Sequence, residues 1–131
     1  MSQEAPLRAK PLILHIDDMQ EVLLSTKVML EALGVDSISA NTAKDGLELA
    51  KRQLPDLVLM DVRMPEIDGH KATRILRGDP ATRHIPILMV TGSDTKDDVE
   101  RAIAEGANGY VIKPLHLDRL KAKIGEWVRL P

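Results

Sequence analysis

Short apolar runs and longer amphipathic stretches alternate along this chain. Four runs, at residues 11–16, 57–60, 87–90 and 109–112, are almost continuously apolar, which is typical of strands buried on both faces of a parallel sheet. A fifth run, at residues 35–40, is more polar, so we expect it at an edge of the sheet. Apolar residues at helical spacing follow each run. Five such pairs of strand and helix predict an α/β domain with a doubly wound parallel sheet.

Capping and breaking residues indicate where the helices begin and end. We expect helices at residues 19–33, 43–54, 69–77, 96–105 and 117–128. The candidate N-caps of the second and fourth helices are Asn41 or Thr42 and Asp94 or Thr95. Gly34 and Gly106 are expected to end the helices before them, and Pro55 stops another. Residues 1–9 are expected to form a flexible tail, and residues 10–131 a single domain.

Composition narrows the class of protein. A chain of 131 residues, 44% hydrophobic and 29% charged, is typical of one globular domain with one core. Its net charge of -2 gives no electrostatic reason to expect nucleic acid or an anionic membrane as a direct partner. The absence of Cys excludes disulfides and thiolate metal sites. No apolar run approaches the length of a membrane span, and the first residues do not resemble a secretory signal. We therefore expect a cytoplasmic protein.

Polar residues follow the strands at one edge of the predicted sheet. Asp17 and Asp18 follow the first strand, Asp61 the third, Thr91 the fourth and Lys113 the fifth. The carboxyl ends of parallel strands share one edge, where binding sites form, so we expect these side chains to converge. Clustered carboxylates repel one another unless a cation intervenes, and oxygen ligands without His or Cys favour Mg²⁺. A metal ion, an ammonium and a hydroxyl around one carboxylate predict phosphoryl transfer to that carboxylate.

Each of these residues also has an ordinary structural explanation. The two acids after the first strand could cap the helix that follows. Thr91 could simply end a strand, and Lys113 could be a solvated charge. An acid at Asp61 is harder to explain in this way, because it ends a buried strand and is costly without a partner. Their joint occurrence at four strand ends favours a functional site. His15, inside the first strand, is predicted to be a buried, hydrogen-bonded core residue rather than a ligand.

The ordered set of motifs resembles that of response-regulator receiver domains of two-component signalling, of the single-domain kind found in chemotaxis. The motifs are the acidic pair at residues 17–18, the block D-V-R-M-P-E-I-D-G from Asp61 to Gly69, Thr91, and Y-V-I-K-P from Tyr110 to Pro114. The resemblance covers about residues 10 to 130. It implies a flavodoxin-like fold of five parallel strands in the order 2-1-3-4-5.

The resemblance also implies how the acids act. Asp61 is the expected phosphoacceptor, which takes phosphate from a phosphohistidine. The expected Mg²⁺ ligands are Asp18, Asp61 and the backbone carbonyl of Arg63, and Asp17 is expected to reach the ion through water. Arg63, two residues after the acceptor, occupies a position that modulates the lifetime of the acyl phosphate in this family.

The remaining site residues are expected to contact the phosphoryl group or to move in response to it. Thr91 and Lys113 would contact the phosphoryl oxygens, and the Lys113–Pro114 peptide bond would be cis. The hydroxyl of Thr91 can reach a phosphoryl oxygen only if its strand end moves inward, which vacates space behind it. Tyr110, on the neighbouring strand, is the aromatic residue placed to swing into that space.

A receiver domain acts through partners rather than as an enzyme, and promotes only its own phosphorylation and dephosphorylation. The expected donor is a sensor histidine kinase or a histidine phosphotransfer protein, and the expected output is contact with a downstream protein target. Two alternatives stay open: a pseudo-receiver that docks without phosphorylation, and a phosphate sink. The chain contains neither GxGxxG nor GxxxxGK[ST], so a dinucleotide or P-loop nucleotide site is unsupported. A haloacid-dehalogenase-like phosphatase would need an acid where Arg63 stands, and a flavodoxin-like FMN site would need a phosphate-binding loop where residues 17–18 are acidic.

Overall fold

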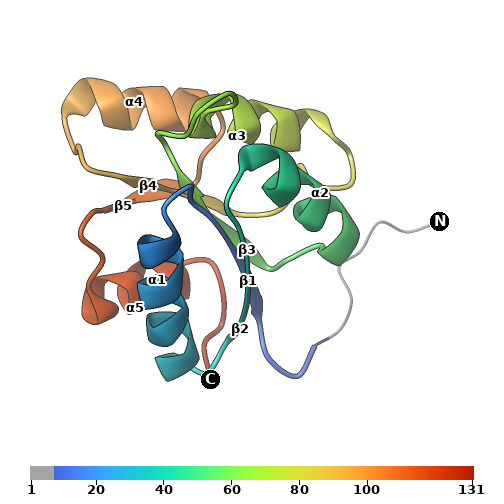
Figure 1. Ribbon diagram of the computed structural model, residues 1–131, viewed down its shortest axis with the longest axis vertical. Helices are drawn as coiled ribbons and strands as arrows, with labels where there is room; N and C mark the ends of the chain where they lie inside the picture. The colour runs from blue at the N-terminus through green and yellow to red at the C-terminus, as the bar shows by residue number, and fades with distance from the viewer. Residues whose placement is uncertain (1–7) are drawn as a thin grey trace.

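The apolar runs form the strands of one central sheet. The computed structural model describes residues 8–131, in which five parallel strands lie in the order β2-β1-β3-β4-β5. Within the described chain the elements are β1 (Leu12–Ile16), α1 (Gln20–Ala32), β2 (Asp36–Ala40), α2 (Ala43–Gln53), β3 (Leu57–Asp61), α3 (Gly69–Gly78), β4 (Ile87–Thr91), α4 (Lys96–Ala104), β5 (Gly109–Ile112) and α5 (Leu117–Gly125). Helices α1 and α5 cover one face of the sheet, and α2, α3 and α4 cover the other (Figure 1). The predicted doubly wound fold and its strand order are confirmed.

Burial follows the position of each strand in the sheet. Every residue of β3, the central strand of the sheet, and of β1 beside it is buried. In β2 only Ala40 is buried, and the strand lies at the edge of the sheet, as its polar sequence predicts. An edge strand has one neighbour, so part of its surface stays in contact with water.

The helix ends agree closely with the sequence. The hydroxyl oxygens of Thr42 and Thr95 accept hydrogen bonds from the third backbone N–H group beyond them, at 3.1 and 3.4 Å, which makes them the N-caps of α2 and α4. Gly34 follows α1 with a φ of +79°, a conformation that glycine adopts without strain. The last helix is shorter than predicted: it ends at Gly125, although Val128 still packs against the core.

Side chains alternate between the two faces of the sheet, and the strand register shows which residues share a face. Met60, Met89 and Tyr110 occupy matching positions on neighbouring strands and contact the core on the α2–α4 side. Val90 and Val111 pair with each other and belong to the core on the α1 and α5 side. Because successive residues of a strand point to opposite faces, the two sets are interleaved along the same strands.

The amino edge of the sheet is closed by polar contacts. Leu12 N–H donates to a carboxylate oxygen of Asp56 at 2.7 Å, and Asp56 N–H donates to the carbonyl of Leu12 at 2.8 Å. Arg77 of α3 donates to several carbonyl oxygens and to the side chain of Asn108. The flexible tail predicted for residues 1–9 falls mostly outside the described residues; within it, Arg8 forms an ion pair with Asp56 at 3.4 Å. Within residues 8–131, no helix combines the length and hydrophobicity that crossing a membrane requires.

Candidate functional site

The sheet brings the predicted site residues to its carboxyl edge. Asp17 follows β1, Asp61 ends β3, Thr91 ends β4 and Lys113 follows β5. Backbone pairing continues past the last strand, where Lys113 N–H donates to the carbonyl of Thr91 at 2.7 Å. All four strands are parallel, so residues up to about a hundred positions apart in sequence meet at one edge.

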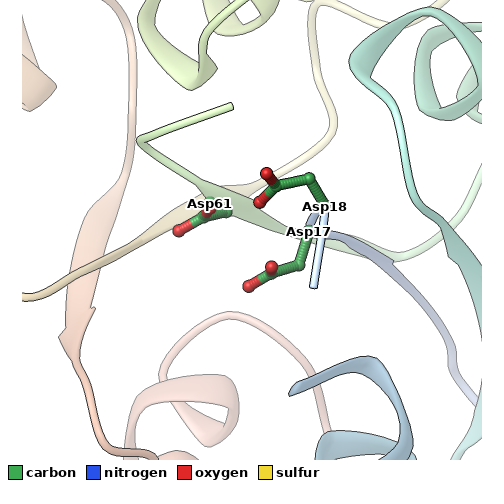
Figure 2. Close-up of side chains that lie close together, drawn as sticks. All are labelled: Asp17, Asp18 and Asp61. Carbon is green, nitrogen blue, oxygen red and sulfur yellow. The ribbon is translucent and has the colours of Figure 1, made fainter. Parts of the chain in front are cut away.

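Three carboxylates form a cluster at the centre of this edge. Carboxylate oxygens of Asp17, Asp18 and Asp61 lie within 4.8 Å of one another, and Figure 2 shows the three side chains close together where the strands end. Asp17 and Asp61 are buried, whereas Asp18 is exposed. The two adjacent acids can both reach the cluster because the strand ends at Ile16, and the chain beyond it no longer alternates as a strand.

Lys113 supplies the positive charge on the opposite side of the cluster. Its Nζ lies 2.8 Å from Oδ1 of Asp61 and 3.2 Å from Oδ2 of Asp17. Burial lowers the pKa of Lys113, but the hydrogen bond and charge of Asp61, together with the charge of Asp17, outweigh this effect and raise its pKa overall. The ammonium is therefore held in its charged form.

One ammonium does not neutralise three carboxylates. Burial raises the pKa of Asp61; the hydrogen bond from Lys113 lowers it, and the charge of Asp17 raises it again. An ion pair alone would lower the pKa of Asp61, so its raised pKa shows that burial and carboxylate repulsion exceed the stabilisation by Lys113. The site is consequently short of positive charge.

A hard divalent cation fits this arrangement. Oδ2 of Asp17 is buried, and apart from its ion pair with Lys113 it has no hydrogen-bond partner among the described residues. Such an oxygen is costly unless a ligand satisfies it. The donors are all oxygens and form an open cluster, which is the environment that Mg²⁺ prefers.

The loop after β3 is packed tightly behind the buried acid. Gly69 N–H donates to the carbonyl of Val62 at 2.9 Å, and any side chain at Gly69 would collide with the backbone carbonyl of Asp61. The Asp61–Gly69 block therefore needs glycine at its end, because the start of α3 approaches the backbone of the acid directly.

Thr91 and Tyr110 face the other side of the sheet from Asp61. The register places Tyr110 opposite Met89, two residues before Thr91, so both side chains point toward α3 and α4. Thr91 Oγ1 donates to the carbonyl of Ser93 at 3.3 Å and accepts from Ser93 N–H at 3.1 Å. The hydroxyl is thus engaged by its own loop.

A cavity of about 880 Å³ joins the two parts of the site. Its walls include Asp18, Asp61, Arg63, Thr91, Tyr110 and Lys113. This volume lies within the range of about 300–1,000 Å³ found for ligand sites. The predicted site residues therefore share one cavity, except Asp17 and Pro114, which do not line it. The Lys113–Pro114 peptide bond at its rim is cis.

Two expectations for the first strand need correction. The acids do not cap α1 through Asp18: the N-cap is Met19, which has no side-chain cap, and its N–H donates to Oδ1 of Asp17 at 2.9 Å. His15 is buried as predicted, but neither ring nitrogen has a hydrogen-bond partner among the described residues. Its surroundings include the apolar side chains of Leu23 and Leu30. Burial is the main cause that lowers the pKa of His15, to about 4.

Sequence reasoning missed one residue of the cavity. His70, the second residue of α3, is buried and lines the cavity, and it directly follows the Asp61–Gly69 block without belonging to it. It lies on the buried face of α3 with Thr73 and Leu76. Helical spacing from these two residues would have assigned His70 to the buried face, where an imidazole without an evident partner is unusual.

Comparison with known proteins agrees with this geometry. A family model described as the response regulator receiver domain matches residues 13–125. The polar-differentiation response regulator DivK of Brucella ovis is 31% identical over 118 residues, which cover 87% of this chain and 96% of that protein. The chemotaxis protein CheY4 of Vibrio cholerae has the same fold, with a TM-score of 0.87 at 23% identity, covering 92% of this chain and 100% of the other.

A third relative has a metal ion in its site. The receiver domain of a sensor histidine kinase from Pseudomonas aeruginosa was crystallised with magnesium coordinated in its active-site cleft; it has a TM-score of 0.83 and 30% identity, and the match covers 91% of this chain and 98% of that one. The family model covers most of the present chain, and the relatives are matched over nearly their full length. The protein therefore belongs to the response regulator receiver domain family, the signalling domains of two-component systems.

Proposed function

We propose that Asp61 is the phosphoacceptor of this receiver domain. The observation that carries the proposal is the position of its carboxylate, which is buried, 2.8 Å from Nζ of Lys113, and in contact range of two further acids. Burial raises the pKa of Asp61, and the same burial leaves its carboxylate oxygens poorly solvated, so little bound water has to be displaced before they attack. Asp18 is exposed, and Asp17 is fully buried and does not line the cavity.

The residues around Asp61 have separate tasks in the transfer. An oxygen of Asp61 attacks the phosphorus of a phosphohistidine, and the imidazole nitrogen of the donor leaves. Lys113 neutralises charge on the phosphoryl oxygens, and Thr91 donates a hydrogen bond to one of them once its hydroxyl leaves Ser93. Such transfers depend mainly on positioning and charge neutralisation.

We propose Mg²⁺ as the cofactor, held by Asp18, Asp61 and the backbone carbonyl of Arg63, with Asp17 contributing through water. Two observations support this assignment: the buried oxygen of Asp17 has no hydrogen-bond partner among the described residues, and the site has an excess of negative charge. When bound, the ion supplies charge neutralisation between the carboxylates and the incoming phosphoryl group. The residues themselves orient the acceptor and exclude other nucleophiles.

Phosphorylation is proposed to act through Thr91 and Tyr110. Movement of Thr91 toward the phosphate vacates space in the cavity that both residues line. Tyr110 turns into that space, which changes the surface between α4 and α5. The phosphate thereby biases two states of the domain, and a partner that binds one of them reads the signal.

The partners follow from this chemistry. The donor is a sensor histidine kinase or a histidine phosphotransfer protein, and the output is contact with a downstream protein in the cytoplasm, without direct binding to nucleic acid or membrane. A docking module that is never phosphorylated is the less favoured alternative, because all three acids and the lysine are present and converge. A phosphate sink would use the same site but have no downstream partner.

The proposal is tested by incubating the protein with acetyl phosphate and Mg²⁺ and measuring its intact mass. The wild-type protein should gain one phosphoryl group, and Asp61→Asn should gain none. Asp56→Asn is the matched control, because Asp56 precedes the same strand at its opposite end, and it should be labelled as the wild type is. Equal labelling of Asp61→Asn would overturn the assignment.

A further inference from the structure

His70 forms part of the inner wall of the cavity that opens at Asp61. It is the second residue of α3, whose amino end lies at the carboxyl edge of the sheet. The residue is 6% exposed, and its Nδ1 is buried without a hydrogen-bond partner among the described residues. Of the described residues that line this cavity, His70 alone has such an atom.

Packing alone gives no reason for an imidazole at this position. The neighbouring turn of the same helical face holds Thr73, which donates to the sulfur of Met89 at 3.4 Å, so this face of α3 is directed at β4. A leucine would bury apolar surface there without cost, whereas an unpaired buried nitrogen costs about 1–3 kcal/mol. Burial is the main cause that lowers the pKa of His70, and Arg101 lowers it further. A neutral imidazole can accept a hydrogen bond at the nitrogen that carries no proton.

Tyr110 is the residue on β5 whose side chain shares this cavity. Its ring is half-buried, and Nζ of Lys123 on α5 lies 5.6 Å from the ring centroid, a distance typical of a cation–π contact. If the ring turns deeper into the cavity, it leaves this cation, and its hydroxyl loses contact with water. A buried hydroxyl requires a new partner.

We propose that His70 is that partner: in the phosphorylated state the hydroxyl of Tyr110 donates a hydrogen bond to Nδ1 of His70. This inference rests on the proposed function, since it names the residue that Tyr110 contacts after its ring has turned inward. His70 is a positioning residue, because it touches neither the phosphate nor the metal. The hydrogen bond to His70 favours the inward position of Tyr110, whereas the contact with Lys123 favours the outward position. The balance between these two contacts sets the fraction of molecules in the active state.

The composition of the chain provides a selective probe. Tyr110 is the only Tyr, so incorporation of 3-fluorotyrosine gives a single ¹⁹F signal from this ring. Beryllofluoride with Mg²⁺ serves as a stable mimic of the phosphoryl group on Asp61. Saturation with this mimic should move the wild-type signal from an outward to an inward environment, and the populations of the two environments are then measured.

Two variants at position 70 separate hydrogen bonding from packing. His70→Leu should reduce the ratio of inward to outward rings by roughly 3- to 10-fold, which is the effect of one lost buried hydrogen bond. His70→Asn keeps a polar atom where Nδ1 stands and should retain most of the wild-type ratio. Lys123→Met removes the outward contact and should increase the ratio by roughly 2- to 5-fold.

A double-mutant cycle isolates the hydroxyl itself. The chain contains no Phe, so fluorophenylalanine labels position 110 alone in Tyr110→Phe. In that background His70→Leu should no longer reduce the inward population. A reduction of the same size with and without the hydroxyl would overturn the proposed bond.

The outcomes distinguish this inference from the proposed function. If Tyr110 turns inward equally in the wild type and in His70→Leu, the role of His70 is wrong while the switch stands. If the wild-type ring does not move although beryllofluoride binds, both the switch and the role of His70 are wrong, and phosphorylation of Asp61 is judged separately by the mass gain. Thr91→Ala should bind beryllofluoride but leave the ring outward; inward movement in that variant would remove Thr91 from the coupling.

Discussion

The polar groups at the two edges of the sheet differ in how completely they are hydrogen-bonded. At the amino edge, Arg77 donates to the carbonyls of Gly106 and Ile85 at 2.8 and 2.7 Å and to the side chain of Asn108 at 2.7 Å. Asn108 Oδ1 also accepts from the backbone N–H of Ile87 at 2.9 Å. At the carboxyl edge, by contrast, a buried oxygen of Asp17 has an ion pair but no hydrogen-bond partner among the described residues, and one lysine faces three carboxylates.

The difference indicates that one edge of the sheet contributes to stability and the other to ligand binding. Polar groups that bind one another hold loops in place and leave nothing for a ligand. Polar groups that are left unsatisfied cost stability, and a ligand that satisfies them recovers that cost as binding energy. Mutations at the amino edge should therefore change stability, and mutations at the carboxyl edge should change ligand binding.

The largest effect is expected at the amino edge. Arg77→Ala removes hydrogen bonds to two loops and to Asn108, and should lower the free energy of unfolding by about 3–4 kcal/mol. Arg74→Ala on the same helix removes only an exposed ion pair with Glu105, 3.0 Å long, and should cost at most about 1 kcal/mol. Urea unfolding of both variants measures the difference. Similar losses in the free energy of unfolding for the two variants would show that the Arg77 contacts are not the main stabilising contacts at this edge.

His15 gives a second large effect, which depends on pH. The unfolded chain takes up a proton on His15 as the pH falls through 6.5, whereas in the folded protein the pKa is lowered to about 4. Stability is therefore lost as the pH falls from 6.5 to 4, by up to about 3 kcal/mol. His15→Leu should remove this loss. Urea unfolding in EDTA at several pH values tests it, and a stability difference between variant and wild type that stays constant with pH would contradict the expectation.

Much of the architecture was predictable because it depends on local patterns. Apolar runs identify buried strands, and parallel strands must present their carboxyl ends at one edge, so the convergence of Asp61 and Lys113 followed from the sequence. The contacts of Arg77 could not be predicted, because most of its partners are backbone carbonyls from loops. Every residue has a carbonyl, so the sequence does not indicate which of them is bound. Nor did the sequence show that both ring nitrogens of His15 and Nδ1 of His70 lack hydrogen-bond partners among the described residues, because it indicates which residue is buried but not what surrounds it.

Metal binding should distinguish the acids from the lysine. Asp18→Ala removes a proposed ligand and should weaken Mg²⁺ binding by about tenfold or more. Lys113→Ala removes a competing positive charge but no ligand, so it should leave Mg²⁺ binding largely intact and impair phosphorylation instead. Calorimetric titration with Mg²⁺ provides both affinities. An equal loss in the two variants would mean that the acids and the lysine do not have separate roles.

The smallest effect is the stability cost of the site itself. The pKa of Asp61 is raised above its ordinary 3.8, so its contribution to stability is complete below that pH and is lost as the pH rises. Asp61→Asn relieves this repulsion and should raise the free energy of unfolding in EDTA by at most about 1 kcal/mol at neutral pH. Added Mg²⁺ should stabilise the wild type more than the variant. A variant less stable than the wild type in EDTA would show that Lys113 outweighs the repulsion.

The central claim is that the carboxyl edge carries one phosphoacceptor, Asp61. The most direct measurement locates the phosphoryl group after labelling with acetyl phosphate and Mg²⁺. Borohydride reduces an aspartyl phosphate to homoserine, and tandem mass spectrometry of the digested protein identifies the position of that residue. We predict homoserine at position 61 alone, in an amount that matches the intact-mass gain. Homoserine at position 17 or 18, or a phosphorylated protein in which position 61 is still aspartate, would contradict the account.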